Sequence, residues 1–379
     1  MKLKSAVFVL LVCGLVLAVL GVSKAVMEVR RIEEVMKKDI LSQQDLQVID
    51  EFINDAVATL VRTIDFTEVS KIRAIIVSHQ SPKTQYAQQY SESAYRRIAE
   101  GMEHVRSDIR DETTLFKVIT NLLILVDSLK DPRLIDLAIQ EIPHDNSAVR
   151  YWAVRASTDA ALWTKIGQSQ STATQLATRI MTACDQVVDD SSPEVLLQMA
   201  QFAGRFDTAQ AAELLMHIAE ARIRSYADWS VGYELMDSAV LRLLTEKILA
   251  GGNGGSDQLA RQFARLCSFT IQRFTKGQSL GRLSDSSRNY LISVLIDTED
   301  KCLGRLLGAP QTTIRRAIEA GDLAALQAEH ARLLGAEGSA GAIATRFNFS
   351  YGAPGENRTV PPVLPDPPQR VVPAAEDQP

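Results

Sequence analysis

The chain has 379 residues, of which 46% are hydrophobic and 6% aromatic, and its formal net charge is −5. This length is enough for a large core or for one extended helical array. The weakly negative charge excludes the basic surface typical of nucleic-acid-binding proteins. Plentiful alanine, leucine, glutamine and isoleucine favour helices over strands.

The N-terminus has the pattern of an export signal. Lys2 and Lys4 precede an apolar run at residues 5–22, about as long as a helix needs to span a bilayer. Residues 1–25 are therefore interpreted as a signal anchor, because the run is long for a cleaved signal, or as a signal peptide cut near residues 23–25. A buried cytosolic helix is the remaining alternative. Both export alternatives place the bulk of the chain outside the cytoplasm.

Helical periodicity continues from the apolar run through most of the chain. Residues 26–41 are expected to form a juxtamembrane helix, with Ile32, Val35 and Ile40 among its apolar positions. The all-helical domain is then predicted over residues 42–335. Ser42 and Asp45 resemble a capping box at its start. Its expected helices span about 43–64, 68–78, 82–109, 115–129, 133–142, 146–156, 171–188, 193–204, 209–224, 228–249, 256–274, 285–307, 311–319 and 322–334.

The segment 115–129 is the centre of the predicted core. It is apolar almost all round, so a helix there should be enclosed by neighbours, with Leu123 and Leu125 fully buried. Pro132 can start the next helix at its first position. Two short amphipathic helices follow, and Trp152 is expected to face the same core. This many helices with short connections predicts an all-α fold of stacked helical hairpins, an α-solenoid.

Residues 131–156 carry a family resemblance. Asp131-Pro132-Arg133 precedes one helix, the turn at Asp145-Asn146 follows, and Ala148-Val149-Arg150 opens a second helix with alanines at 153 and 156. This pattern resembles a HEAT-type repeat. The resemblance implies a HEAT-like α-solenoid, a binding surface and no chemistry. It also implies that Arg150 ties one repeat to the next.

The cysteines and the C-terminal tail have simple interpretations. Cys184, Cys267 and Cys302 lie far apart in helical patterns and are expected to be buried apolar residues, with pairing of two of them as the alternative. Residues 336–379 hold eight of the thirteen prolines and are predicted to be disordered. Residues 362–365 match a PxxP docking pattern, although a plain solvated tail is the simpler interpretation.

No stretch of the sequence matches a catalytic, phosphate-binding or metal-binding motif. Glu213, His217 and Glu220 share one helical face, which can hold a metal but is interpreted as a solvated stripe. No metal and no cofactor are therefore assigned. The candidate binding residues fall into two groups, an outer face of one helix and a cluster of aromatic and acidic side chains: Arg150, Tyr151 and Arg155, and Tyr226, Asp228, Trp229, Tyr233 and Glu234.

These patterns favour a non-catalytic scaffold or protein-binding module in the cell envelope. Its expected partners are an unidentified protein and, through the N-terminal helix, a membrane, but not nucleic acid. A helical-toroid enzyme acting on a glycan or envelope polymer is the alternative, because such enzymes place aromatics and paired acids together. A soluble exported binding protein is a third. An open cleft holding Asp228 and Glu234 beside exposed Trp229 would favour the enzyme.

Overall fold

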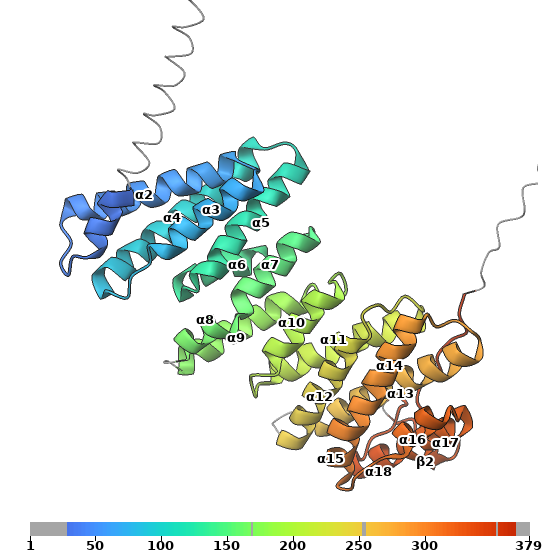
Figure 1. The fold of residues 1–379 in the computed structure, drawn as a ribbon. Helices are drawn as coiled ribbons and strands as arrows, with labels where there is room; N and C mark the ends of the chain where they lie inside the picture. The colour runs from blue at the N-terminus through green and yellow to red at the C-terminus, as the bar shows by residue number, and fades with distance from the viewer. Residues whose placement is uncertain (1–28, 168–169, 252–254, 354, 369–379) are drawn as a thin grey trace, which may run out of the picture. The chain divides into compact units, whose positions relative to one another are not determined.

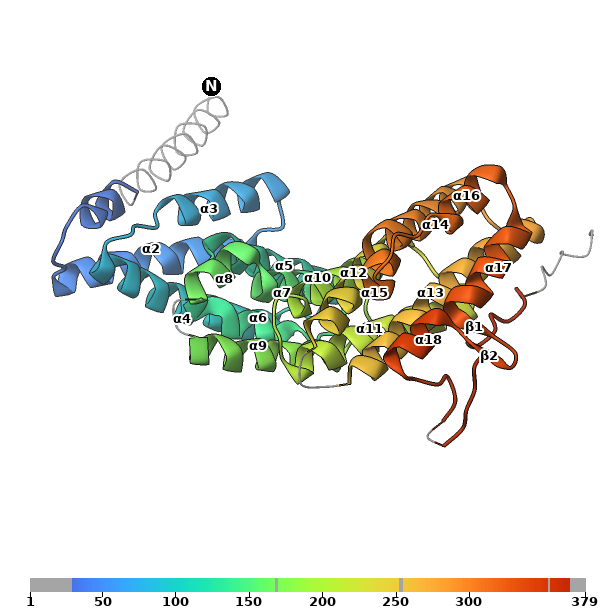
Figure 2. The ribbon, with the colours of Figure 1, turned by 90° about the horizontal axis from the view of Figure 1, so that it is seen from below.

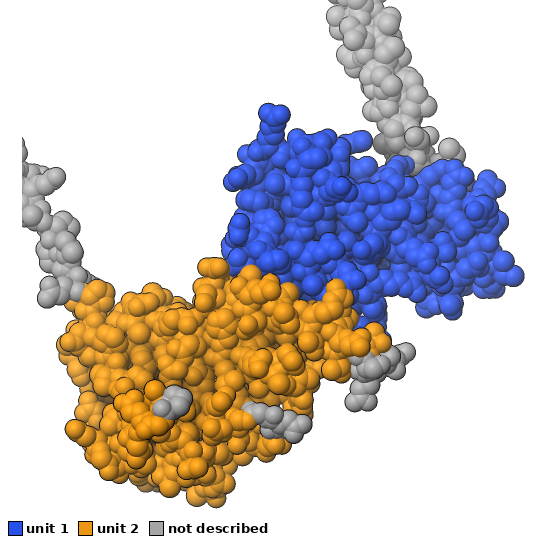
Figure 3. Space-filling view, turned by 180° about the vertical axis from the view of Figure 1, so that it is seen from behind, with its two compact units in different colours: residues 1–169 blue, residues 170–379 orange. Residues whose placement is uncertain are grey.

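The structure is a computed structural model that describes residues 29–167, 170–251, 255–353 and 355–368. Figure 1 shows that it is built almost entirely of helices, as the sequence predicts. The chain divides into two compact units, residues 1–169 and residues 170–379, which Figure 3 distinguishes by colour. The all-α class that the sequence predicts is confirmed. The domain predicted for residues 42–335 includes parts of both units.

The first unit is a stack of helices in which each packs on the next or the next but one. Residues 29–36 are helical and precede the labelled helices. Those are α2 (Gln43–Arg62), α3 (Phe66–Ser78), α4 (Thr84–Asp108), α5 (Glu112–Leu129), the 3₁₀ turn η1 (Pro132–Leu134), α6 (Ile135–Glu141), α7 (Ser147–Thr158) and α8 (Ala160–Ile166).

Helix α5 is the core of this unit, as predicted. It contacts α2, α3, α4, α6 and α7, and the Leu123 and Leu125 side chains are completely buried. The Asp111 carboxylate accepts from the Thr114 N–H at its start. At its end Lys130 adopts the left-handed conformation, and Asp131 with Pro132 opens η1.

Several predicted helix ends are confirmed and others are wrong. The capping box of Ser42 and Asp45 is present. Helix α3 starts at Phe66, two residues before its predicted start, and Asp65 caps it. Helix α4 starts at Thr84 and not at Pro82, because Lys83 is still extended. Helix α8 was not predicted, and Asp159 caps it.

The predicted juxtamembrane helix lies partly outside the described residues. Within them it ends at residue 36, and Ile40 is exposed. The turn after residue 36 brings the Leu41 N–H to the Gln85 side chain, which explains why the helix does not reach residue 41. No helix in the described ranges is long and apolar enough to cross a membrane. The predicted signal segment, residues 1–25, lies outside those ranges.

The second unit is also made of helices that pack on one another. Its helices are α9 (Gln170–Asp185), α10 (Pro193–Ala203), α11 (Ala209–Ala227), α12 (Leu235–Ala250), α13 (Ser256–Ser279), α14 (Asp285–Thr298), the π-helical turn η2 (Glu299–Leu303), α15 (Gly304–Leu307), α16 (Thr313–Ala320), α17 (Leu323–Leu334) and α18 (Ala342–Phe347). A short antiparallel pair, β1 (Gly335–Ala336) and β2 (Ser339–Ala340), joins the last two helices.

Helix α13 is the centre of this unit. It packs on α11, α12, α14, α17 and α18, and Figure 2 shows α17 and α18 beside it. Cys184, Cys267 and Cys302 are buried and unpaired, as the sequence predicted. Burial raises the pKa of each of the Cys184 and Cys267 thiols to about 12.

The prediction of a disordered tail is wrong for the described residues between 336 and 368. This segment adds α18 and then an extended stretch to the second unit, and it buries Ile343 and Leu364. Gly335 has a φ of +116°, and a Cβ there would lie 2.1 Å from the Thr359 carbonyl oxygen. The tail therefore folds back closely over the strand pair. The proline-rich composition suggested disorder because such a segment cannot bury enough apolar surface by itself, yet α13 and α17 provide a surface on which α18 packs.

Candidate functional site

The predicted binding face of α7 differs from expectation. Arg150 is only 4% exposed, so its prediction as an outer-face residue is wrong. Trp152, predicted to face the core, is half-buried instead. The Trp152 ring stands edge-on to Tyr151, with ring centroids 5.5 Å apart, and the Arg155 guanidinium carbon lies 5.3 Å from the Trp152 ring centroid. Tyr151, Trp152 and Arg155 thus form a partly exposed aromatic and cationic surface.

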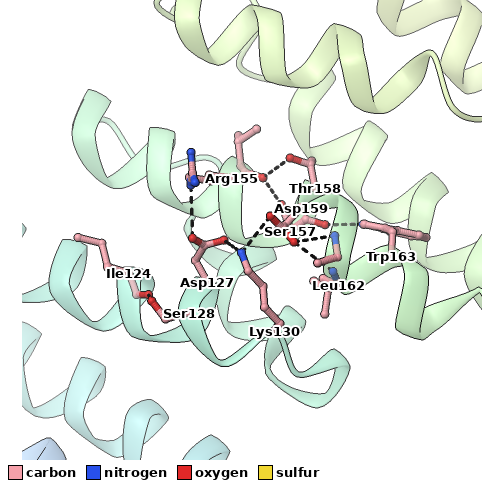
Figure 4. Close-up of polar contacts among 12 residues, drawn as sticks. Ile124, Asp127, Ser128, Lys130, Arg155, Ser157, Thr158, Asp159, Leu162 and Trp163 are labelled. Atoms are coloured by element: carbon pink, nitrogen blue, oxygen red, sulfur yellow. Dashed lines mark hydrogen bonds and ion pairs between the residues drawn. The ribbon is translucent and has the colours of Figure 1, made fainter. Parts of the chain in front are cut away.

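A polar junction includes Arg155 of this surface (Figure 4). The Asp127 carboxylate of α5 accepts from Lys130 Nζ at 2.6 Å and from Arg155 Nε at 3.3 Å. Lys130 also pairs with Asp159, the cap of α8, at 2.9 Å. The junction therefore connects α5, α7 and α8 through opposite charges. Because Asp127 is buried, these partners offset the cost of removing its charge from water.

A cleft of about 560 Å³ lies in the same unit. Its walls come from the loop before α4, from α4 itself, from the turn between α5 and η1, and from α8. Three cations, Lys130, Arg133 and Lys165, line it together with Asp131. Two of these cations are held by main-chain oxygens, because Lys165 donates to the Lys130 carbonyl and Arg133 donates to the Gln88 carbonyl.

The second group of predicted residues surrounds a buried ion pair. Arg222 of α11 and Asp237 of α12 are almost completely inaccessible, and the Arg222 guanidinium donates to both Asp237 oxygens at 2.7 and 3.0 Å. The Tyr226 hydroxyl donates to the same carboxylate at 2.6 Å. Burial, reinforced by Asp237, raises the pKa of Tyr226 well above its usual value. Burial opposes the charge of Arg222, but Asp237 outweighs it and raises the pKa of the guanidinium.

The loop 228–234 contacts this ion pair, because the Arg222 guanidinium donates to the Gly232 carbonyl at 3.0 Å. Asp228 caps α11, and the next two N–H groups close a Schellman motif, from Trp229 to the Tyr226 carbonyl and from Ser230 to the Ser225 carbonyl. Trp229 occupies the left-handed position that glycine usually takes, with a φ of +58°, and Tyr233 has a φ of +52°. The predicted helix 228–249 is therefore wrong at its start, since α12 begins only at Leu235.

Trp229 is stacked against a buried cation. The Arg273 guanidinium carbon of α13 lies 4.0 Å from the Trp229 ring centroid. Burial lowers the pKa of Arg273, and the charge of Glu234 opposes this shift. Glu234 is 3% exposed, and within the described part of the chain Glu234 Oε1 makes no hydrogen bond. The indole N–H of Trp229 donates to the Pro365 carbonyl oxygen at 2.9 Å.

The predicted residues of this cluster have different positions. Tyr226, Trp229 and Glu234 come together, whereas Asp228 and Tyr233 are exposed and lie outside the buried network. Sequence reasoning missed Arg222 and the α13 residues Gln272, Arg273 and Lys276. Arg222 lies four residues before Tyr226 on one helical face, which is a usable signal. The α13 residues are more than 30 positions away from the loop, so no local pattern connects them to it.

The candidate metal face is not assembled. His217 contacts Asp185 at 2.8 Å, while the Glu220 carboxylate accepts hydrogen bonds from Nη1 and Nη2 of Arg265. In the described ranges no group of three or more His, Cys, Asp or Glu side chains is placed to hold a metal ion.

No family model, curated protein or solved structure matches this chain.

Proposed function

We propose that this chain is a non-catalytic scaffold or protein-binding module of the cell envelope, built on a HEAT-like helical solenoid. The observation that carries the proposal is the state of the acids in the aromatic cluster. Asp237 is neutralised by Arg222, and Glu234 is buried. Glycoside hydrolysis requires two carboxylates that flank an accessible substrate, and of the three acids Asp228, Glu234 and Asp237 only Asp228 is exposed. The geometry therefore supports binding over hydrolysis.

The hairpin of α6 and α7 supports the HEAT-like assignment. The Asp131 side chain accepts from the Arg133 N–H, and Pro132 opens η1 at its first position. Asn146 caps α7, and Val149 and Ala153 are buried. The burial of Arg150 fits the inter-repeat role that the resemblance implies.

The proposed location rests on residues 1–25. Their basic flank and apolar run direct the chain to a membrane, with the bulk of it extracytoplasmic. Fractionation of cells that produce the full chain tests this. Recovery of the full-length chain as a soluble cytosolic protein would contradict it.

The partner is best sought by photo-cross-linking from defined positions. A photoreactive amino acid placed at position 151 or 155 of the full chain should capture a discrete protein in the native envelope. The same residue at position 213, an exposed position of α11, serves as a control and should capture little. If both sites remain silent and the purified chain degrades an envelope glycan in an Asp228-dependent way, the helical-toroid enzyme is the better assignment.

A further inference from the structure

The tail contains an extended segment that packs on α13 of the second unit through side-chain hydrogen bonds. This proline-rich segment (residues 359–366) is neither helix nor strand. Pro361 and Leu364 are buried and Pro367 just beyond it is half-buried, whereas Val363 is 67% exposed. Burial at every third residue is the period of a polyproline II helix. Within the described ranges, residues 361–366 bond to side chains and to no other main chain.

One side chain of α13 forms hydrogen bonds with two main-chain groups of this segment. Gln272 Oε1 accepts from the Leu364 N–H at 2.7 Å, and Gln272 Nε2 donates to the Pro362 carbonyl at 2.9 Å. The Gln272 amide is itself oriented, because its Nε2 also donates to Ser268 Oγ, which in turn contacts His330 Nε2 at 2.8 Å. Ser268 of α13 and His330 of α17 thus fix the orientation of the Gln272 amide.

Two further donors complete the contact. Lys276 Nζ, one helical turn after Gln272, donates to the Leu364 carbonyl at 2.8 Å and pairs with Asp366 at 2.6 Å. Trp229 Nε1 donates to the Pro365 carbonyl, and the Arg273 guanidinium stacks on the same indole. We call the surface formed by Trp229, Gln272, Arg273 and Lys276 the peptide groove.

The groove and the segment are chemically complementary. Prolines 361, 362 and 365 have no N–H, so a proline-rich strand offers mainly carbonyl oxygens. The groove presents mainly donors, from an amide, an ammonium and an indole, and a single acceptor for the one N–H of Leu364. Aromatic side chains that line a groove for a preformed polyproline II strand are a recurrent mode of peptide recognition. The left-handed backbone of Trp229 places its indole there against its conformational preference, which is a feature of functional loops.

We propose that the peptide groove is a recognition site for an extended Pro-x-Leu-Pro segment of a partner protein, with the chain's own residues 362–365 as the resident competitor. This inference rests on the proposed protein-binding function and names the class of partner. The resident segment is held by side-chain contacts and one main anchor, Leu364, without a main-chain ladder, so it can open locally. Its tether gives it an effective concentration of about millimolar, which a partner must overcome.

The test uses a fluorescent peptide with the sequence of residues 359–368 and the full chain. Leu364→Asp should vacate the groove, so this variant should bind the peptide at least about tenfold more tightly than the parent does. Val363→Asp is the matched control, because Val363 is exposed in the same segment, and it should behave like the parent. Adding Gln272→Ala to the Leu364→Asp variant should weaken peptide binding at least about tenfold.

Hydrogen exchange on the parent provides a second measurement that needs no folded variant. Excess peptide should speed exchange at the Leu364 N–H, because a competitor displaces the resident segment from Gln272. Unchanged exchange at the Leu364 N–H would overturn the proposal. A folded Leu364→Asp variant that binds the peptide no more tightly than the parent does would also overturn it. Dimerisation of the Leu364→Asp variant with the parent would identify a second copy of this chain as the occupant and would also overturn the proposal. None of these outcomes affects the cross-links expected from positions 151 and 155. The proposed function and the peptide groove can therefore fail separately.

Discussion

Trp229 shows how a single residue can decide local structure against its own preference. A non-glycine residue in the left-handed region costs roughly 1–2 kcal/mol, and sequence reasoning expects glycine at such a helix end. Here the indole has a carbonyl to bind and a guanidinium to stack on, and these contacts offset the backbone strain. The aromatic cluster was therefore recognisable from the sequence, but the helix end within it was not.

The buried ion pair beneath Trp229 yields a stability prediction. Asp237→Ala leaves the Arg222 charge buried without its partner, and such losses usually cost about 3–5 kcal/mol. Asp228→Ala is the control, because Asp228 is exposed, and it should stay within about 0.5 kcal/mol of the parent. Urea unfolding monitored by tryptophan fluorescence measures both. Similar effects of the two substitutions would mean that the Arg222 charge is satisfied in some other way.

His330 predicts a pH dependence of stability. Burial lowers the pKa of His330 from 6.5 to about 4. Between these values the unfolded chain binds a proton that the folded chain does not, so the free energy of unfolding falls as the pH drops from about 6.5 to 4. The loss should amount to roughly 1–3 kcal/mol, and it is absent above pH 6.5.

The His330 contribution can be isolated by substitution. His330→Gln keeps a hydrogen-bonding group near Ser268 but cannot titrate in this range. Urea unfolding at pH 7 and pH 4.5 should therefore show a smaller acid-induced loss in this variant than in the parent. Equal losses would show that the His330 ring takes up its proton in the folded state.

At the scale of elements, the two tryptophans near α5 differ in how deeply they are buried. Trp163 of α8 is buried, and its indole N–H donates to the Ser157 carbonyl at 2.8 Å, whereas Trp152 of α7 is only half-buried. Trp163→Ala should therefore cost about 3–5 kcal/mol, as Leu123→Ala should cost about 2–5. Trp152→Ala should cost less than either. Thermal melting of the three variants checks the order, and a larger loss for Trp152→Ala would contradict the burial seen at α7.

At the scale of the whole molecule, the tail belongs to the second unit. Ending the chain after Leu334 removes the buried side chains of Ile343, Tyr351 and Leu364, each worth about 1.5–3 kcal/mol when fully buried. For a unit of this size the melting temperature should then fall by at least about 10 °C. Ending the chain after Pro368 should leave it within about 2 °C. If the shorter chain also melts within that margin, the tail does not pack on α13 as described.

Local patterns in the sequence determined the all-α class, the buried centre at α5 and several caps. Ser42 with Asp45 forms the predicted capping box, and Asp111 and Thr208 likewise cap their helices, because capping involves residues three positions apart. The burial of Leu123 and of the three cysteines was also predictable, because all four residues lie in helical patterns of apolar side chains. An apolar helix with no polar face has to be enclosed by neighbours, whichever neighbours those are.

Contacts between distant segments were decided only by the tertiary structure. The order of the tail depends on Gln272 and Lys276, which lie about 90 residues before Leu364. The burial of Arg150 and the exposure of Trp152 depend on which helices pack on α7, and a helical wheel does not contain that information. A proline-rich composition predicts a chain that cannot bury apolar surface by itself. It cannot reveal that α13 offers a row of donors to the carbonyl oxygens that such a chain leaves unbonded.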